Sequence, residues 1–290
     1  MQITTEMIKR LRDKTGAGMM DCKRALESTE GNMDAAVEFL RKKGAAVAQK
    51  RSDRSAKEGM IVTSVSQDGK TGIILEVNSE TDFVGRSDDF VRFAETVAQT
   101  LQQQQSSTLE ELLTAATDGG KTVSALMNDL LAKVGEKIEI RRFKIVESDG
   151  GLVSSYTHLG SKIGVLVELT GANASDSDVS VGRDIAMQIA AMNPQVISRD
   201  QIEQKMIDQE LDIYRTQAAN EGKPTQVVER IAAGRLEKFF QEVCLIEQTY
   251  IKDPGRTVKD FLRETGSVAG TTISVKQFYR FHLGEELSTN

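Results

Sequence analysis

The chain is poor in the residues on which many catalytic and metal-binding sites depend. Its 290 residues include two cysteines and two histidines. Cys22 and Cys244 lie far apart in helix-like segments, which excludes a disulfide framework and favours a reducing compartment. His158 and His282 are too few for a metal centre built on imidazole, so we expect no bound metal and no cofactor.

Long apolar runs and catalytic motifs are also missing. No stretch approaches the roughly 20 apolar residues that span a bilayer, and polar and charged residues between Thr4 and Arg12 interrupt any secretory signal. We therefore expect a cytoplasmic protein without a membrane partner. Walker-type loops and dinucleotide fingerprints are absent, and neither histidine lies in a nucleophile motif. The sequence thus predicts an interaction protein rather than an enzyme, with no catalytic residue.

The charge balance argues against nucleic acid as the main partner. The formal net charge is −6, whereas phosphate binding needs a net or local excess of basic residues. One local excess occurs in a short stretch, which contains Arg41, Lys42, Lys43, Lys50, Arg51, Arg54 and Lys57. This stretch is either a solvated linker or an electrostatic contact with an acidic or RNA-rich partner.

Residues 1–54 are predicted to form a three-helix module and a basic linker. Met7, Ile8 and Leu11 share one helical face, and Gly16 and Gly18 separate this helix from the next. A third helix is expected to begin after Gly31-Asn32 and to end at Gly44, with residues 45–58 as a tether. The unit resembles a ubiquitin-associated-type domain.

The remainder of the chain contains a diverged internal repeat. Without a gap, a shift of 92 positions places Gly59 on Gly151, Gly72 on Gly164 and Phe93 on Ile185, and the turn signals coincide as well. The end of each copy matches at a shift of 135, which places Gly135 on Gly270. Each copy reads as a β-hairpin, one or two helices and a third strand, at 137–145 and 272–281. We therefore predict an α+β fold with small antiparallel sheets in two core subdomains, 55–147 and 148–290.

The two shifts differ because the second copy contains an insertion at about 198–243. Apolar residues recur at helical spacing on both sides of Asn220-Glu221-Gly222-Lys223-Pro224. A helical hairpin is the natural interpretation. It is either a packed extra helix pair or, as we favour, a projecting arm that touches a partner.

The segment Glu76–Val84 places an acid beside a large apolar ring where a strand gives way to a helix. Full burial of a Phe side chain contributes roughly 2–3 kcal/mol, so Asp82-Phe83 is either a core plug or a wedge facing a partner. At the ungapped shift the second copy has Asn173-Ala174-Ser175-Asp176, without an aromatic residue. The scaffold therefore does not require a Phe there, which favours the wedge.

Two long segments, Leu11–Leu26 and Leu75–Val84, resemble the translation elongation factor Ts family, as does the run Ser155–His158 followed by Ile163–Val167. The resemblance covers most of the chain. It implies a guanine-nucleotide exchange factor that binds elongation factor Tu, both GDP-bound and nucleotide-free, and needs no direct nucleic-acid contact. Longer bacterial members carry a C-terminal helical module, whereas this sequence stops soon after its last strand, at Glu285–Asn290. No contact of that module is carried over.

The resemblance also implies roles for individual residues. Thr81, Asp82, Phe83 and Val84 would reach the nucleotide domain of elongation factor Tu and help to displace the magnesium ion that bridges GDP. The three-helix module would pack on the same domain, and the sheet bearing His158 would contact the third domain. The candidates in the module are Leu11, Arg12, Met19 and Met20, although a methionine in the bundle core, a solvated arginine and a merely structural histidine are the open alternatives. A ribosome- or RNA-associated binding protein that uses the basic linker is the alternative function.

Overall fold

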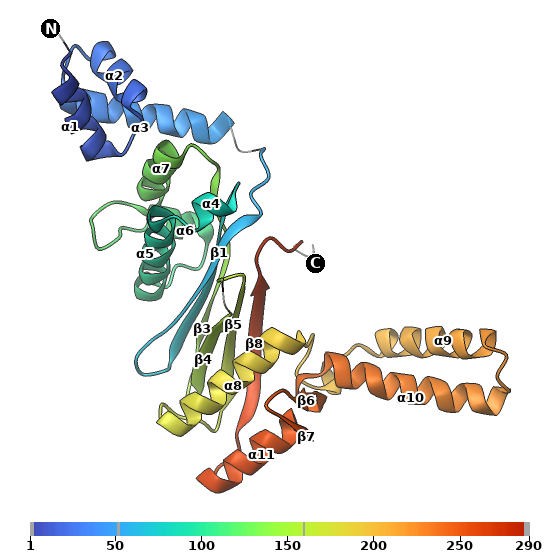
Figure 1. The fold of residues 1–290 in the computed structure, drawn as a ribbon. Helices are drawn as coiled ribbons and strands as arrows, with labels where there is room; N and C mark the ends of the chain where they lie inside the picture. Colours follow the sequence, from blue (N-terminus) through green and yellow to red (C-terminus); the bar gives the residue numbers. More distant parts are fainter. Residues whose placement is uncertain (1–2, 51–52, 159, 287–290) are drawn as a thin grey trace.

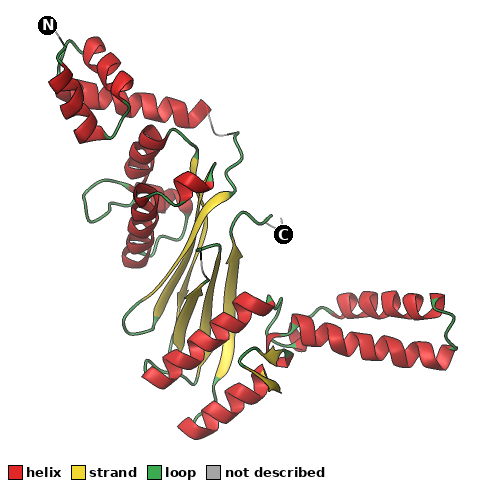
Figure 2. Ribbon diagram, viewed as in Figure 1, coloured by secondary structure: helices red, strands yellow, loops and turns green. Residues whose placement is uncertain are grey.

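The computed structural model describes residues 3–50, 53–158 and 160–286. Arg51, the side chain of Lys50 and the terminal run Leu287–Asn290 lie outside the described residues. The molecule is elongated: the N-terminal helices lie at one end, two sheets occupy the middle, and a helical hairpin projects near the other end (Figures 1 and 2). The mixture of helices and small antiparallel sheets confirms the predicted α+β class.

The N-terminal module consists of α1 (Thr5–Thr15), α2 (Met19–Ser28) and α3 (Met33–Lys50). The hydroxyl of Thr4 accepts a hydrogen bond from the N–H of Met7 and caps α1, which ends at the left-handed Gly16. The three helices enclose one small apolar cluster, formed by Leu11, Ala17, Cys22, Ala25, Leu26, Ala36 and Leu40.

The third helix continues six residues beyond Gly44, so the predicted helix end at this glycine is wrong. A Cβ atom at Gly44 would lie 3.3 Å from the Cβ of Ala132 and 3.5 Å from the carbonyl oxygen of Asn128. Both of these residues belong to α7 (Val123–Val134). The glycine therefore serves the close approach of two helices. The module packs directly on the core through α3 (Figure 1), whereas the sequence predicted only a tether there.

The first core subdomain contains one three-stranded antiparallel sheet and four helices. The strands pair in the order β1 (Glu58–Val65), β2 (Thr71–Ser79) and β3 (Ile138–Glu147). The predicted apolar stripe on α5 (Asp88–Gln104) is confirmed, because its side chains pack against Ile73, Leu75 and Val77 of β2. The other helices are α4 (Asp82–Gly85), α6 (Leu109–Thr114) and α7.

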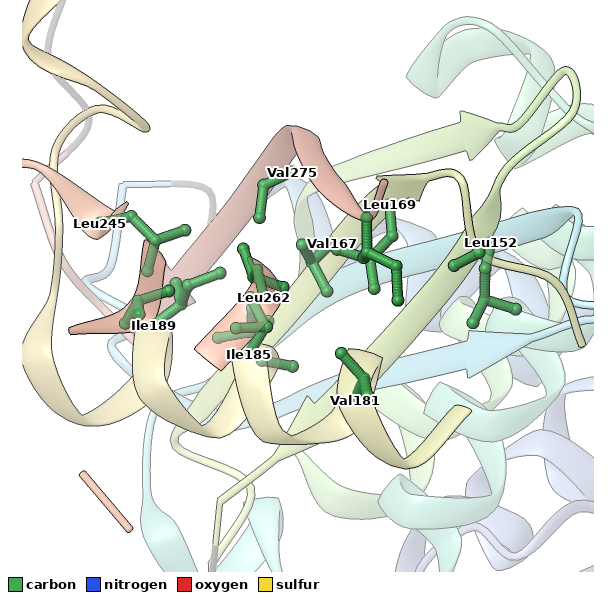
Figure 3. Packing of buried hydrophobic residues seen from close by; sticks show 14 of the residues in the cluster. Leu152, Val167, Leu169, Val181, Ile185, Ile189, Leu245, Leu262 and Val275 are labelled. Carbon is green, nitrogen blue, oxygen red and sulfur yellow. The ribbon is translucent and has the colours of Figure 1, made fainter. Parts of the chain in front are cut away.

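The second subdomain repeats this plan with strands in the order β4 (Leu152–Thr157), β5 (Ile163–Thr170) and β8 (Ser274–His282). Its helices α8 (Asp176–Met192) and α11 (Val258–Ala269) cover one face of the sheet. Figure 3 shows Ile185 and Ile189 of α8 packed with Val167, Leu262 and Val275. The segment between these helices also contains four short elements, η1 (Arg199–Gln201), η2 (Leu245–Glu247), β6 (Thr249–Tyr250) and β7 (Asp253–Thr257).

The two sheets pack face to face through the sides that their helices leave open. A separate apolar cluster joins them, formed by Ile61, Ile74, Val146, Val153, Leu166, Phe281 and Leu283. Two glycines that the repeat pairs, Gly72 and Gly164, lie at this contact. A Cβ atom at Gly72 would come within 2.5 Å of Val153 Cγ1, and one at Gly164 would come within 2.5 Å of Ile61 Cγ2. The repeated glycine thus permits close packing of the two copies.

The structure corrects the helix register of the repeat. Both α5 and α8 begin after a serine cap, Ser87 and Ser175, and end at a left-handed residue, Gln105 and Asn193. These caps correspond at a shift four residues shorter than that of the strands, so pairing Phe93 with Ile185 is wrong. Four residues are about one helical turn, so a displacement of four residues leaves the apolar stripe on the same face of the helix. The sequence alignment therefore did not show the error in register. The missing residues lie before α8, where the second copy has no counterpart of α4.

The predicted hairpin is present as α9 (Gln204–Asn220) and α10 (Thr225–Val243), and it projects from the second subdomain (Figure 1). A cluster around Phe240 and Val243 fills its base. The guanidinium of Arg199 donates hydrogen bonds to Glu247 at 2.7 Å and to Glu237 at 3.1 Å, and it lies over the ring of Phe240, 4.4 Å from the ring centre. The arm is thus anchored at its base.

Replacing residues 208–235 with a short Gly/Ser loop should leave both sheets folded. The first copy closes its subdomain without an equivalent of this arm, and the base cluster and Arg199 would be retained. A change in loop length costs only modest entropy. Hydrogen exchange on the shortened chain should show β4, β5 and β8 as protected as in the full chain; loss of their protection would make the arm part of the core.

Candidate partner-binding site

The short helix α4 presents Phe83 to solvent directly after β2. The Phe83 side chain is 85% exposed, whereas its neighbour Val84 packs against the core of the first subdomain. In the isolated chain Phe83 is therefore no core plug. An aromatic ring this exposed on a well-packed scaffold is free to enter a partner.

Local interactions fix the shape of α4. The hydroxyl of Thr81 accepts a hydrogen bond from the N–H of Val84 at 3.4 Å, and Asp82 pairs with Arg86 at 3.3 Å. The helix also lies against the start of β1: a Cβ atom at Gly85 would be 2.9 Å from the Cα of Gly59. The exposed ring of Phe83 is thus attached to a helix whose backbone is fixed by local contacts.

A hollow of about 520 Å³ lies beside α4 and is lined by residues of both subdomains. Its walls include Asp82 and Arg86 of the first copy and Lys162 of the β4–β5 turn. The turn is attached there, because the N–H of Ile61 donates a hydrogen bond to the carbonyl oxygen of Ser161 at 2.8 Å. The helix α4 and the turn therefore line the same hollow.

His158 follows the last residue of β4 and stands exposed on the same turn. Its ring Nδ1 lies 3.0 Å from the hydroxyl of Tyr156, and its backbone N–H donates a hydrogen bond to the carbonyl oxygen of Ile163. The predicted contact residue His158 therefore lies on the turn that lines the hollow beside α4.

The predicted residues of the N-terminal module divide into surface and core. Met19 and Met20 are 41% and 61% exposed, which excludes the bundle-core alternative for both. Arg12 is exposed as well. Leu11 is completely buried in the helical cluster, so its direct contact with a partner, predicted above, is wrong for this structure. A motif run on an amphipathic helix contains both faces, and Leu11 lies on the inner one.

A groove of about 580 Å³ lies between the module and helices α5 and α7, beside the contact of α3 with α7. On its core side Asp89 forms ion pairs with Lys133 and Arg92. The hydrogen bond from Lys133 is the main reason why the pKa of Asp89 lies below its usual range. These charges are matched within the core, so the module and α7 meet without an unpaired carboxylate at this position.

Within the described residues, no group of three or more His, Cys, Asp or Glu side chains is placed to hold a metal ion. In the same part of the chain, no helix combines the length and apolar character needed to cross a membrane.

The model of one protein family, described as elongation factor TS, matches residues 80–285. The chain is 47% identical over 287 residues to elongation factor Ts of Chlorobium phaeobacteroides strain BS1, an alignment that covers 98% of this chain and 99% of the relative. The chain belongs to the elongation factor Ts family. Elongation factor Ts of Clostridium botulinum strain Alaska E43 is 44% identical over 283 residues, covering 98% of this chain and 93% of the relative. That of Chloroherpeton thalassium is 44% identical over 288 residues, covering 98% and 99%.

Membership of the elongation factor Ts family confirms the resemblance on which the residue roles were based and associates the chain with translation elongation. The alignments extend over the N-terminal module and the helical arm as well as the duplicated core. The roles of the individual residues are taken up below as proposals.

Two residues in the surroundings of α4 could not be found from the sequence. Glu136 contacts Thr81 from a segment 55 positions further along the chain. Lys162 reaches the hollow from the other copy of the repeat. No local pattern marks either position, because both contacts depend on how distant segments pack.

Proposed function

We propose that the protein is a guanine-nucleotide exchange factor that binds elongation factor Tu·GDP and promotes GDP release during translation elongation, in the cytoplasm. The observation that carries the proposal is Phe83, 85% exposed on a capped and packed helix of a chain in the elongation factor Ts family. The chain would perform no bond chemistry of its own. It would change the relative stability of two states of its partner.

The physical requirement is differential binding. A wedge loosens a ligand only if it binds the ligand-free partner better than the ligand-bound one. The coupling is reciprocal, so GDP must weaken the binding of this chain by the same factor. Nanomolar GDP affinity corresponds to about −12 kcal/mol. An extensive interface is therefore needed, and it would combine α4, the β4–β5 turn with His158, and the surface of Met19 and Met20.

Thr81, Asp82, Phe83 and Val84 would act at the nucleotide domain. Phe83 would enter between helices of the partner, and the resulting displacement would remove the magnesium ion that bridges GDP. Val84 anchors the segment in the core while Thr81 caps it, so the ring can be inserted without unfolding its own support.

The alternative function, a ribosome- or RNA-associated protein, would use the basic stretch. Several of its charges are already paired: Lys42 with Glu38, Lys43 with Asp21 and Arg54 with Glu80. These pairs favour the exchange factor. Binding to phosphates weakens steeply between about 50 and 200 mM salt. An interface anchored by Phe and Met side chains should weaken little over the same range of salt concentration.

Calorimetry with two forms of elongation factor Tu tests the proposal. The chain should bind the nucleotide-free form more tightly than the form loaded with GDP and magnesium, because only this difference can drive release. Equal affinity for the two forms would contradict an exchange function, however tight the binding.

A further inference from the structure

We propose that Glu136 is a positioning residue for the exposed Phe83, acting through Thr81. The inference rests on the proposed exchange function and deepens it. Glu136 lies between α7 and β3 and does not belong to the segment that resembles the family motif.

The carboxylate of Glu136 accepts hydrogen bonds from both donors of Thr81, and the hydroxyl lies within reach of both carboxylate oxygens. The N–H of Thr81 donates to Oε2 at 3.0 Å, and the Thr81 hydroxyl lies 2.8 Å from Oε1 and 3.1 Å from Oε2. A hydroxyl has one proton and two lone pairs. Once its proton points at Glu136, a lone pair is left to accept the hydrogen bond from the N–H of Val84 that caps α4. Glu136 thus sets the direction of the cap.

A second glutamate returns the interaction. Glu80 precedes Thr81, and its Oε1 accepts a hydrogen bond of 2.7 Å from the N–H of Lys137, the residue after Glu136. The other oxygen of Glu80 accepts from Arg54 at 3.0 Å. Segments 80–81 and 136–137 therefore hold each other through two glutamate side chains, each of which accepts a hydrogen bond from the backbone of the other segment.

The repeat shows that the scaffold does not require this carboxylate. Gly135 and Gly270 end α7 and α11 in the same left-handed conformation. The residue that follows is Glu136 in the first copy and Thr271 in the second, where its hydroxyl donates to the carbonyl oxygen of Gly171 at 3.0 Å. The second copy has no counterpart of α4. The carboxylate occurs in the copy that carries the exposed ring.

The placement of Glu136 also connects two partner-facing surfaces. It follows Gly135, the cap residue at the end of α7, and α7 contacts α3 of the N-terminal module where Gly44 meets Ala132. The position of Phe83 relative to the surface of Met19 and Met20 is therefore set through α7. Loss of the hydrogen bonds of Glu136 would leave the N-terminal module packed on the core, while the ring of Phe83 would no longer be held in one position.

The test compares Glu136→Ala, Glu136→Gln and Glu111→Ala in full-length chains. Labelled GDP release from elongation factor Tu is followed at increasing concentrations of each variant. Glu111→Ala is the matched control, because Glu111 forms a chemically similar capping box with Thr108 on α6.

Glu136→Ala should lower the maximal release rate about tenfold, with the half-saturating concentration changed less than about threefold. Glu136→Gln, which keeps an acceptor oxygen, should recover most of the rate, and Glu111→Ala should release GDP at the wild-type rate. The second measurement is hydrogen exchange at the backbone amides of Asp82–Arg86. It should be faster in Glu136→Ala and unchanged in Glu136→Gln and Glu111→Ala.

A wild-type rate in Glu136→Ala overturns the inference. An equal loss in Glu136→Gln, or in Glu111→Ala, also overturns it, because the loss would then follow stability rather than the hydrogen bonds to Thr81. If Glu136→Ala fails to fold, Glu136→Asp replaces it. This side chain keeps the carboxylate but is one methylene shorter and withdraws its oxygens from Thr81, so GDP release should again be slower and amide exchange at Asp82–Arg86 faster; a wild-type rate overturns the inference. Should Phe83→Ala release GDP as fast as the wild type, the proposed function fails, whereas loss in Phe83→Ala with none in Glu136→Ala sinks only this inference.

Discussion

Replacing Phe83 with alanine is expected to slow GDP release from elongation factor Tu by about 30- to 150-fold, the equivalent of roughly 2–3 kcal/mol of buried aromatic side chain. The free energy of unfolding should change by no more than about 0.5 kcal/mol, because the ring is 85% exposed and supports no core. Stimulated release at saturating chain concentration and urea unfolding measure the two quantities.

Val268→Ala is a suitable control for Phe83→Ala. Val268 is an apolar residue on α11 that is 90% exposed, so its removal also trims an apolar surface without opening a cavity. It should leave both release and stability unchanged. Marked unfolding of Phe83→Ala, with release reduced only in proportion to the unfolded fraction, would contradict the role of Phe83 as a wedge.

Replacing Glu76 with alanine is expected to lower the free energy of unfolding by about 3 kcal/mol. Its carboxylate is completely buried in β2 and accepts hydrogen bonds from Arg142 at 2.6 Å, Arg141 at 3.2 Å and the N–H of Gly284 at 2.8 Å. Breaking a buried ion pair typically costs about 3–5 kcal/mol. The low end applies because both arginines remain partly exposed and keep hydrogen bonds to Glu285.

Glu168→Ala is the matched comparison, since the repeat pairs Glu168 with Glu76. Glu168 is equally buried but bonds to Lys276 and Gln277 within its own subdomain. Hydrogen exchange after β8, at residues 283–286, should accelerate in Glu76→Ala and not in Glu168→Ala. A loss of less than about 1 kcal/mol in urea unfolding of Glu76→Ala would show that the arginines do not depend on this carboxylate.

The architecture of the core could be predicted because the repeat is marked by glycines with a physical task. Gly72 and Gly164 permit the close contact of the two sheets, and Gly135 and Gly270 end equivalent helices. The helix register failed because a shift by one turn preserves an apolar stripe. Gly44 was misread because a glycine at a helix end and one at a helix crossing look alike in sequence.

The exposure of Phe83 could be predicted, but for an incomplete reason. The ungapped comparison with Asn173–Asp176 was wrong, because the second copy has no counterpart of α4. The absence of the whole element still means that the scaffold does not require the Phe83 ring, and the structure exposes it. Leu11 was misplaced because its motif run covers both faces of α1, and only packing against α2 and α3 shows which face is buried. Glu136 could not be found, since its contact with Thr81 depends on how α7 is packed.

The proposed exchange function requires this chain to accelerate GDP release from elongation factor Tu. The most direct measurement follows fluorescent GDP leaving elongation factor Tu, in magnesium and excess unlabelled GDP, with the chain at about one hundredth of the elongation factor Tu concentration. We expect this small amount to empty the whole population faster than spontaneous release, in many turnovers per chain, because nucleotide rebinding frees the chain again. A release rate equal to the spontaneous one, unchanged even when the chain is in excess, would contradict the exchange function.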